Sequence, residues 1–496
     1  MTTWTRRNFI HVVGGAAAAG LRAAEPADEI IFVSATRLAN LIREKKVSAL
    51  EAVRAFIARI EKVNPRLNAV VQTCFERALQ EAKEADELLV RGQTKGPLHG
   101  VPMTIKDSID TAGVITTGGT VGRMHYVPGK DATVVARLRA AGAILLGKTN
   151  TPEFTLAGGG IAGVGTTANI IYGISRNPYD PTRSTSGSSG GAGAIVAAGG
   201  AAFDIGSDWG GSIRGPAHAN GIAGIKPTSG RVPRTGHIVD YGGVFDSWQQ
   251  LGPLARRVED LILILPLIIG PDFRDAGIIP VPWNDPNRVE VSKLRVAFYP
   301  ENGIAETTQE TKETVRRAAR HLEEAGCRVK EDYPRDLVME MEEVRAKLVR
   351  ADGWSYLKRL ADRWGTKAPS ATIVERLKEE PLLTAEYTEL LEQQDDARRK
   401  LLWWVKNYDV VLCPVAGKPA PPINLGAEAS RRGPGVSYTG LYNSTGWPAG
   451  VVRAGTSPEG LPIGVQVVAQ PWRDDVVLAV CRHLESKTGG WQKPAV

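Results

Sequence analysis

The spacing of apolar residues along the chain distinguishes helices from strands. Between residues 34 and 64 apolar side chains recur every three or four positions, which predicts two amphipathic helices. Ser48, followed three residues later by Glu51, forms a capping box that opens the second helix. Pro65 is expected to close that helix, because proline disrupts helical hydrogen bonding.

Short apolar runs alternate with further helical segments over the rest of the chain. We expect strands at 100–106, 143–146, 202–205, 222–226, 294–299, 329–332, 410–414 and 461–470, and helices at 76–90, 132–141, 189–198, 258–269, 309–325 and 474–485. This alternation predicts an α/β fold whose core is a large, mixed, twisted sheet covered by helices on both faces. Residues 336–406 are charged and purely helical, which predicts a helical cap over that sheet. Without repeats or low-complexity linkers, residues 25–496 are expected to form a single domain.

The first 24 residues have the composition of an export signal. Arg6 and Arg7 precede a short, weakly apolar stretch, and the small residues Ala23 and Ala24 follow it. This order predicts a twin-arginine signal peptide at 1–24, a periplasmic or secreted protein, and no stable membrane anchor after signal removal; the alternative is a disordered basic tail. The apolar run at 261–269 is too short to span a bilayer.

The charge and the cysteines narrow the class of protein further. The net charge is +7, but Lys and Arg are interspersed with Asp and Glu, so nucleic acid is not an expected partner. The seven histidines form no metal-binding motif, and we expect neither a metal nor a cofactor. The four cysteines form no Cys-x-x-Cys motif and are expected to be buried free thiols. The sequence leaves open whether the chain forms a homodimer.

Three polar residues stand in contexts suited to amide hydrolysis. Lys106 ends an apolar strand, and Ser188 and Ser212 lie in glycine-rich turns. Burial would lower the pKa of a lysine so that its neutral amine could accept a proton. Gly210 and Gly211, just before Ser212, would let consecutive backbone N–H groups face an oxyanion.

Each of these residues also has an ordinary structural interpretation. Lys106 could be a surface cation, and Ser188 could cap a helix. Gly187-x-Ser189-x-Gly191 matches a nucleophile elbow, which would make Ser189 the nucleophile and require a downstream histidine.

Two further features have structural interpretations. Ser355-x-x-Lys358 matches a catalytic serine–lysine pattern but stands in a charged helical stretch, so we interpret it as chance. His218 and Asn220 are expected to satisfy buried backbone groups.

Six sequence blocks occur in the order found in the amidase signature family. They are Gly100-Val101-Pro102-Met103-Thr104-Ile105-Lys106-Asp107, Asn177-Pro178-Tyr179-Asp180, Gly187-Ser188-Ser189-Gly190-Gly191, Asp208-Trp209-Gly210-Gly211-Ser212-Ile213-Arg214, Gly224-Ile225-Lys226-Pro227-Thr228 and Gly460-Leu461-Pro462-Ile463-Gly464-Val465-Gln466. The resemblance covers about 34–485, and a match over six blocks is more specific than any single motif. The block near Asn177 and residues 439–470 most resemble fatty-acid amide hydrolases and acylamidases.

The resemblance implies a mechanism and a set of site residues. Ser212 would be the acyl nucleophile, Ser188 would relay its proton across a cis Gly187–Ser188 peptide bond, and Lys106 would be the base. A small-molecule carboxamide or N-substituted linear amide would be the substrate.

The resemblance also assigns supporting roles around the nucleophile. Backbone N–H groups of Trp209, Gly210, Gly211 and Ser212 would form the oxyanion hole. The side chains of Ser189, Asp208 and Arg214 would support these groups without contacting the substrate. Taken by itself, Arg214 is more readily interpreted as a structural ion-pair partner than as a group that binds substrate.

Two positions depart from the family pattern. The family usually has glycine at the position of Ser186 and a smaller aliphatic residue at that of Trp209, so the substrate preference is open. Two alternative functions remain: the glutaminase subunit of an amidotransferase acting on tRNA-bound substrates, and an inactive exported amide-binding protein.

Overall fold

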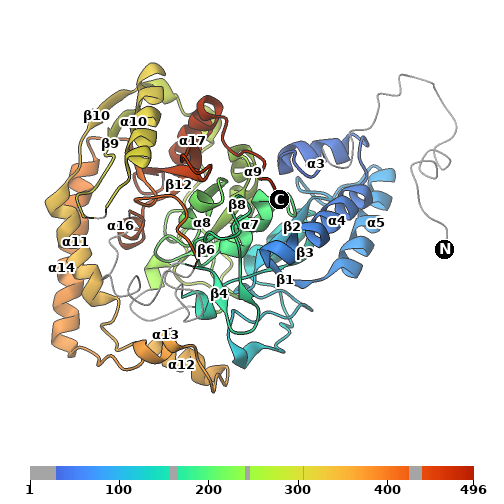
Figure 1. Ribbon diagram of the computed structural model, residues 1–496, viewed down its shortest axis with the longest axis horizontal. Helices are drawn as coiled ribbons and strands as arrows, with labels where there is room; N and C mark the ends of the chain where they lie inside the picture. Colours follow the sequence, from blue (N-terminus) through green and yellow to red (C-terminus); the bar gives the residue numbers. More distant parts are fainter. Residues whose placement is uncertain (1–29, 157–165, 241–245, 305, 424–437) are drawn as a thin grey trace.

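The computed structural model describes residues 30–156, 166–240, 246–304, 306–423 and 438–496 (Figure 1). The expected signal peptide at 1–24 lies outside the described residues, as does the stretch 158–165, whose glycines predict a loop. Among the described helices, none has both the length and the apolarity that a membrane crossing requires.

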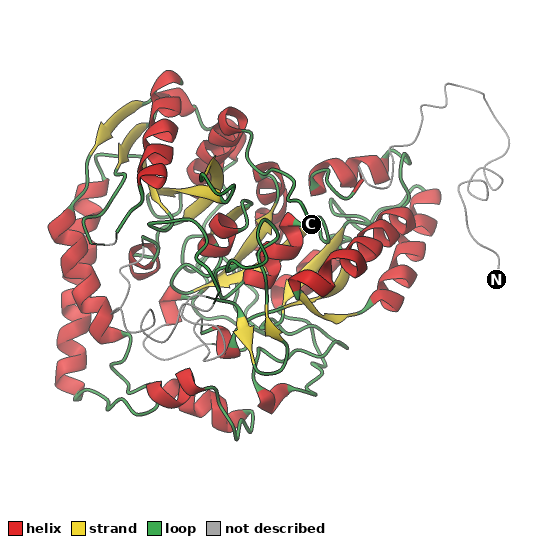
Figure 2. Cartoon of the chain, in the orientation of Figure 1, coloured by secondary structure: helices red, strands yellow, loops and turns green. Residues whose placement is uncertain are grey.

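An eleven-stranded mixed sheet runs through the centre of the described part (Figure 2). In chain order its strands are β1 (Val70–Thr73), β2 (Pro102–Lys106), β3 (Ile144–Thr149), β6 (Phe203–Asp208), β7 (Ala223–Lys226), β8 (Gln250–Ala255), β9 (Arg295–Phe298), β10 (Arg328–Glu331), β11 (Val410–Pro414), β12 (Ala449–Thr456) and β13 (Pro462–Ala469). The spatial order is β1-β3-β2-β6-β8-β7-β12-β13-β11-β9-β10, and β4 (Ala168–Asn169) pairs with β5 (Gly173–Ile174) separately. Strand β2 is parallel to both β3 and β6, whereas β7, β8, β12 and β13 pair antiparallel. The mixed sheet expected from the sequence is confirmed.

Helices cover both faces of the sheet. They are α3 (Ala35–Arg43), α4 (Ala49–Leu67), α5 (Phe75–Val90), α6 (Thr133–Ala140), α7 (Gly190–Ala197), α8 (Arg214–Ala219), α9 (Val258–Ile268), α10 (Gln309–Glu324), α11 (Arg335–Leu348), α12 (Ser355–Arg363), α13 (Ala371–Arg376), α14 (Thr384–Val405), α16 (Gly440–Ser444) and α17 (Asp474–Thr488). Gly450 packs against Val477 of α17, whereas Gly464, which pairs with Arg453, abuts His218 of α8. Positions 450 and 453 are an odd number of residues apart, so these two helices lie on opposite faces.

The helical cap is formed by α11, α12, α13 and α14, which confirms the helical character expected for 336–406 (Figure 1). One side of the cap buries Val344, Leu348 and Leu390 against Trp248. This apolar contact fixes the cap on the loop that leads into β8.

Two local features differ from the sequence-based expectations. The capping box of Ser48 and Glu51 is present, but α4 continues through Pro65 and ends at Leu67. Near the end of a helix, the missing proline N–H costs little when other contacts hold the last turn. Strands β1, β4, β5, β8 and β12 were not anticipated. Strands β4 and β5 have only two residues each, and β8 and β12 are interrupted by glycine, which weakens a strand pattern.

Candidate active site

The site lies at the carboxyl ends of two parallel strands. Lys106 is the last residue of β2 and Asp208 is the last residue of β6, and the two strands pair directly. Ser188 and Ser189 precede α7, and Ser212 lies in the turn between β6 and α8. Open α/β sheets hold functional groups at this edge because adjacent parallel strands end there together.

Lys106 is completely buried and surrounded by hydroxyl groups. Its Nζ lies 2.6 Å from Oγ of Ser188, 2.9 Å from Oγ of Ser189 and 2.9 Å from Oγ of Ser207. The surface-cation interpretation of this residue is therefore wrong. A buried lysine bonded to neutral hydroxyls rather than to a carboxylate carries little compensation for its charge.

Burial lowers the pKa of Lys106 to about 7, although the negative charges of Asp208 and Asp204 act in the opposite direction. A neutral amine has two N–H donors and one lone pair. With three hydroxyls around it, neutral Lys106 can donate to two of them and accept a hydrogen bond from the third. The closest hydroxyl is that of Ser188.

The two serines before α7 have different surroundings. The peptide bond between Gly187 and Ser188 is cis, as the family resemblance implied. Ser189 binds Lys106 and the backbone of Ser207, and none of the described histidines is bonded to it. A nucleophile elbow needs a histidine base, so this arrangement does not support Ser189 as the nucleophile.

The turn that carries Ser212 is held by a buried carboxylate. Asp208 accepts hydrogen bonds from the backbone N–H groups of Gly211 (2.8 Å) and Ile213 (3.0 Å). Arg214 pairs with it at 2.8 Å, and both side chains are fully buried. Burial alone would raise the pKa of Asp208, but the charge and hydrogen bonds of Arg214 outweigh this and hold the pKa well below its usual range.

This network changes the expected set of oxyanion donors. The N–H of Gly211 is already donated to Asp208, whereas the N–H groups of Gly210 and Ser212 have no acceptor among the described residues. The Ser212 hydroxyl likewise makes no hydrogen bond to a described residue, and the side chain is half-buried. Its carbonyl accepts from the N–H of Ser189 at 3.2 Å, so the two serine turns lie side by side.

Trp209 connects this turn to the cap. Its ring lies 6.2 Å from that of Trp248, and it packs against two apolar clusters that contain Leu348 and Leu357 of the cap helices. A smaller aliphatic residue would fill less of this interface, so Trp209 narrows the space between the turn and the cap.

Several residues of the site were not identified from the sequence. Ser207 binds Lys106. Three residues bind the Arg214 guanidinium: Thr439 at the N-cap of α16, Asn443 in α16 and Gln466 in β13. Ser207 directly precedes Asp208 in a block that was recognised, so its position was a usable signal. The other three lie more than 220 residues from Arg214, and no local pattern links them to it.

The remaining candidate residues have structural roles. His218 accepts from Gly464 and Asn220 donates to Thr185, as expected for groups that satisfy buried backbone. Lys358 binds Asp362 on an exposed face of α12, which supports a chance match of the serine–lysine pattern there. All four cysteines are free; three are buried and Cys74 is half-buried.

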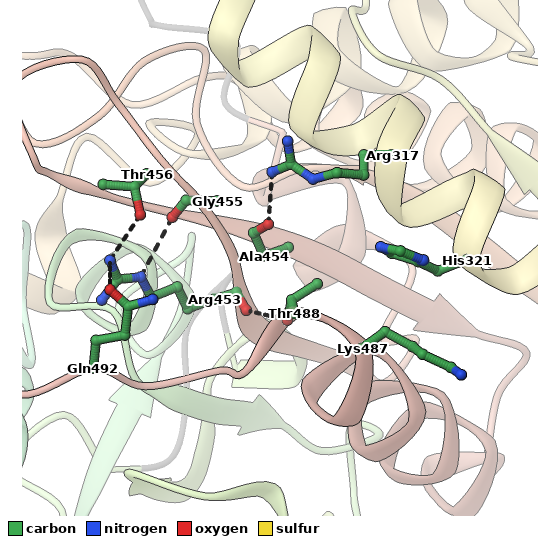
Figure 3. Close-up of a pocket in the computed structure, with 9 residues that line it drawn as sticks. All are labelled: Arg317, His321, Arg453, Ala454, Gly455, Thr456, Lys487, Thr488 and Gln492. Atoms are coloured by element: carbon green, nitrogen blue, oxygen red, sulfur yellow. Dashed lines mark hydrogen bonds between the residues drawn. The ribbon is translucent and has the colours of Figure 1, made fainter.

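Two cavities in the described part lie away from this centre. One of about 380 Å³ lies between α10, β12 and α17 and is lined by Arg317, Arg453 and Lys487 (Figure 3). The other, of about 300 Å³, is lined by Asp110, His237 and neighbours. Neither includes a serine of the site, so we do not assign the site to either cavity. No cluster of metal-ligating side chains occurs within the described ranges.

Comparison with known proteins agrees with this geometry. The family model described as Amidase matches residues 51–478. The chain is 35% identical to a glutamyl-tRNA(Gln) amidotransferase subunit from Moorella thermoacetica, covering 93% of this chain and 97% of that protein. It is 34% identical to indoleacetamide hydrolase of Bradyrhizobium diazoefficiens, covering 92% and 86%. The solved structure of a fatty acid amide hydrolase superposes with a TM-score of 0.81 at 25% identity, covering 93% of this chain and 86% of that one.

Proposed function

Since this chain belongs to the amidase signature family of carbon–nitrogen hydrolases, we propose that it cleaves a carboxamide or N-substituted linear amide to a carboxylic acid and ammonia or an amine. The observation that carries this proposal is the 2.6 Å contact between buried Lys106 and Ser188. It combines a lysine whose pKa is lowered to about 7, so that part of it is neutral at pH 7, with a hydroxyl that can pass on a proton.

In the proposed acylation step, neutral Lys106 accepts the proton of Ser188 as Ser188 accepts that of Ser212. The Ser212 Oγ then attacks the amide carbon, and the carbonyl oxygen becomes an oxyanion that the N–H groups of Gly210 and Ser212 stabilise. The C–N bond breaks as Ser188 returns a proton to the leaving nitrogen. Water, deprotonated along the same route, hydrolyses the acyl-enzyme and restores Ser212.

The roles of Asp208 and Arg214 in this proposal are to position the turn. The Asp208 carboxylate accepts from the N–H groups of Gly211, Ile213 and Arg214, but not from those of Gly210 and Ser212. A preorganised turn needs no rearrangement when the oxyanion forms.

Replacement of the nucleophile tests the proposal. Ser212→Ala should lower kcat on a primary amide by about 10⁴-fold or more while the melting temperature stays near that of the wild type. Ser486→Ala, on an exposed position of α17, is the matched control and should retain full activity. A fluorophosphonate probe should label Ser212, and peptide mapping should locate the label. Full activity of Ser212→Ala, or a label on Ser189, would overturn the assignment.

A second candidate is glutaminase activity within an amidotransferase, because the identity to a protein of that kind extends over 93% of this chain. The twin-arginine pattern argues against it, since tRNA charging takes place in the cytoplasm. Release of ammonia from glutamine, measured against release from simple amides, distinguishes the two functions.

We also propose that the protein is exported by the twin-arginine route, on the basis of Arg6 and Arg7. Fractionation of cells that express the full chain should recover activity in the periplasm or medium. When both arginines are replaced by lysine, the amidase activity should stay in the cytoplasmic fraction. If the activity is distributed between the fractions as in the wild type, export by this route is contradicted.

A further inference from the structure

A cation of the cap reaches the turn that carries Ser212. A methyl group placed on Gly210 would lie 3.5 Å from Nη2 of Arg345, and one placed on Gly440 would lie 2.8 Å from its Cζ. Arg345 belongs to α11, which packs beside α16 (Figure 1). The guanidinium is therefore held between the turn proposed to bind the oxyanion and the helix that follows Thr439.

Among the described residues, Arg345 has few hydrogen-bond acceptors. Its side chain is only 15% exposed, and its one hydrogen bond to a described residue joins Nη1 to Oε2 of Glu342 over 3.4 Å. Charged hydrogen bonds of this kind are usually about 2.8 Å long. Its Nε is buried without a partner within the described ranges. Burying a cation with so few acceptors is costly unless a ligand supplies them.

Among the described residues, the acidic groups near Arg345 compensate its charge only weakly. Asp208 is already paired with Arg214 at 2.8 Å. Burial raises the pKa of Glu342 despite the opposing charge of Arg345, and Oε1 of Glu342 has no partner among the described residues. The aromatic ring of Trp248, whose centroid lies 5.9 Å from Cζ of Arg345, favours a cation but supplies no counter-ion.

We propose that Arg345 determines specificity by binding a carboxylate on the substrate, so that the enzyme prefers amides of dicarboxylic acids over uncharged amides. A guanidinium presents two parallel N–H donors that match a carboxylate. Among the described residues, Arg345 uses only Nη1 in a hydrogen bond. The inference rests on the proposed function, because it places the amide carbonyl at Gly210 and Ser212 and the second acid group at Arg345. Arg350, a second arginine of the cap, is 57% exposed and lies 3.9 Å from Glu379.

The test compares two series of primary amides. One series carries a terminal carboxylate two to four methylene groups from the amide, starting with succinamate; the other carries a methyl group in its place, starting with butyramide. The wild type should hydrolyse the acidic series with the higher kcat/KM. In Arg345→Gln the ratio between the two series should fall about 10- to 100-fold, because one charged hydrogen-bonding partner is lost.

Three further variants separate recognition from a structural role. Arg350→Gln removes a matched cap arginine and should leave the ratio unchanged. Arg345→Lys keeps the positive charge but lacks the two parallel N–H donors of the guanidinium, and should therefore retain part of the preference. Glu342→Gln removes the competing carboxylate and should lower KM for succinamate, a change that mere loosening of the cap would not produce.

The outcomes for the two proposals are distinguishable. Equal activity on the two series, or an unchanged ratio in Arg345→Gln, overturns the inference and leaves the amidase proposal standing. If the wild type hydrolyses neither series, the proposed function fails for simple amides. The inference about Arg345 is then tested by calorimetric measurement of succinamate binding. Succinamate should then bind Ser212→Ala and should not bind the Ser212→Ala, Arg345→Gln double variant; binding to both variants, or to neither, overturns it.

Discussion

Two lysines are buried on neighbouring parallel strands, but their hydrogen-bond partners differ. Lys106 on β2 pairs in register with Thr149 of β3, so Lys148 of β3 points to the opposite face of the sheet. Lys148 donates to the Ile109 carbonyl and, over 2.8 Å, to the Thr111 hydroxyl, whereas Lys106 contacts three serine hydroxyls.

Burial has nearly the same electrostatic effect on both lysines. It lowers the pKa of Lys106 to about 7 and that of Lys148 to about 8, opposed in the second case by the charge of Asp107. The difference therefore lies in what surrounds each amine. The Ile109 carbonyl has no proton to give, and the Thr111 hydroxyl donates its own proton to that carbonyl over 3.3 Å. The Ser188 hydroxyl lies 2.6 Å from Lys106 beside the Ser212 turn, so of these two lysines Lys106 is the better placed for the proposed role of base. A lowered lysine pKa by itself does not identify a catalytic residue.

The largest expected effect is the loss of the Lys106 amine. Lys106→Met should lower kcat/KM about 10³- to 10⁴-fold, because it removes the proposed proton acceptor while keeping a side chain of similar length. Steady-state kinetics on a primary amide, at pH values well above 7, measure this loss. Activity within tenfold of the wild type would show that another group acts as the base.

The equivalent change at the second lysine should affect folding instead. Lys148→Met should lower the free energy of unfolding by about 1–3 kcal/mol, since the Ile109 carbonyl and the Thr111 hydroxyl lose their donor. Activity should stay within a few-fold of the wild type. Urea denaturation and kinetics on the same preparation check both; a 10³-fold loss of activity at wild-type stability would contradict the distinction between the two lysines.

The pH dependence of activity should follow Lys106 and not Lys148. Protonated Lys106 cannot accept a proton, so kcat/KM should be low below the pKa, rise through about pH 7 and level off above it. The midpoint should be unchanged in Lys148→Met. A profile that falls with pH through this range would exclude a neutral lysine as the base.

The smallest expected effect concerns Asp204, whose negative charge raises the pKa of Lys106. Asp204→Asn should move the midpoint of the pH profile to lower pH, by less than about one unit. The shift is small because burial also raises the pKa of Asp204 itself to about 7, so this carboxyl is only partly ionised at that pH. A midpoint that moves upward would contradict the proposed coupling.

The local parts of the site could be predicted from the sequence, and the long-range parts could not. The strand ending in Lys106 and the two serine turns have short, distinctive patterns of apolar residues, hydroxyls and glycines. The interactions that hold Arg214 come from Thr439, Asn443 and Gln466, and no spacing rule connects them to it. The hydrogen bond from the Gly211 N–H to Asp208 could not be predicted either, because a run of glycines does not show which backbone N–H a carboxylate will bind.

The same limits apply to the fold. Most of the longer helices were expected from the sequence, and β11 begins and ends at the expected residues, whereas the short helices α8 and α16 were missed. Strands β8 and β12 were missed, since their glycines weaken the pattern and their stability comes from neighbours on both sides in the sheet. Pro65 was a misleading signal because a proline near a helix end can be tolerated when tertiary contacts favour the helix.

The long-range contacts of Arg214 bear on when the enzyme becomes active during synthesis. A nascent chain that ends before Thr439 already contains Lys106 and both site serines, yet its Arg214 lacks the acceptors that α16 and β13 supply. Strand β7 lacks its partner β12 at the same stage. The ribosome must therefore release nearly the whole chain before the Ser212 turn is held in place. On the proposed mechanism, we therefore expect unfinished or prematurely terminated chains to contain Ser212 without the contacts that hold its turn, and to lack amidase activity.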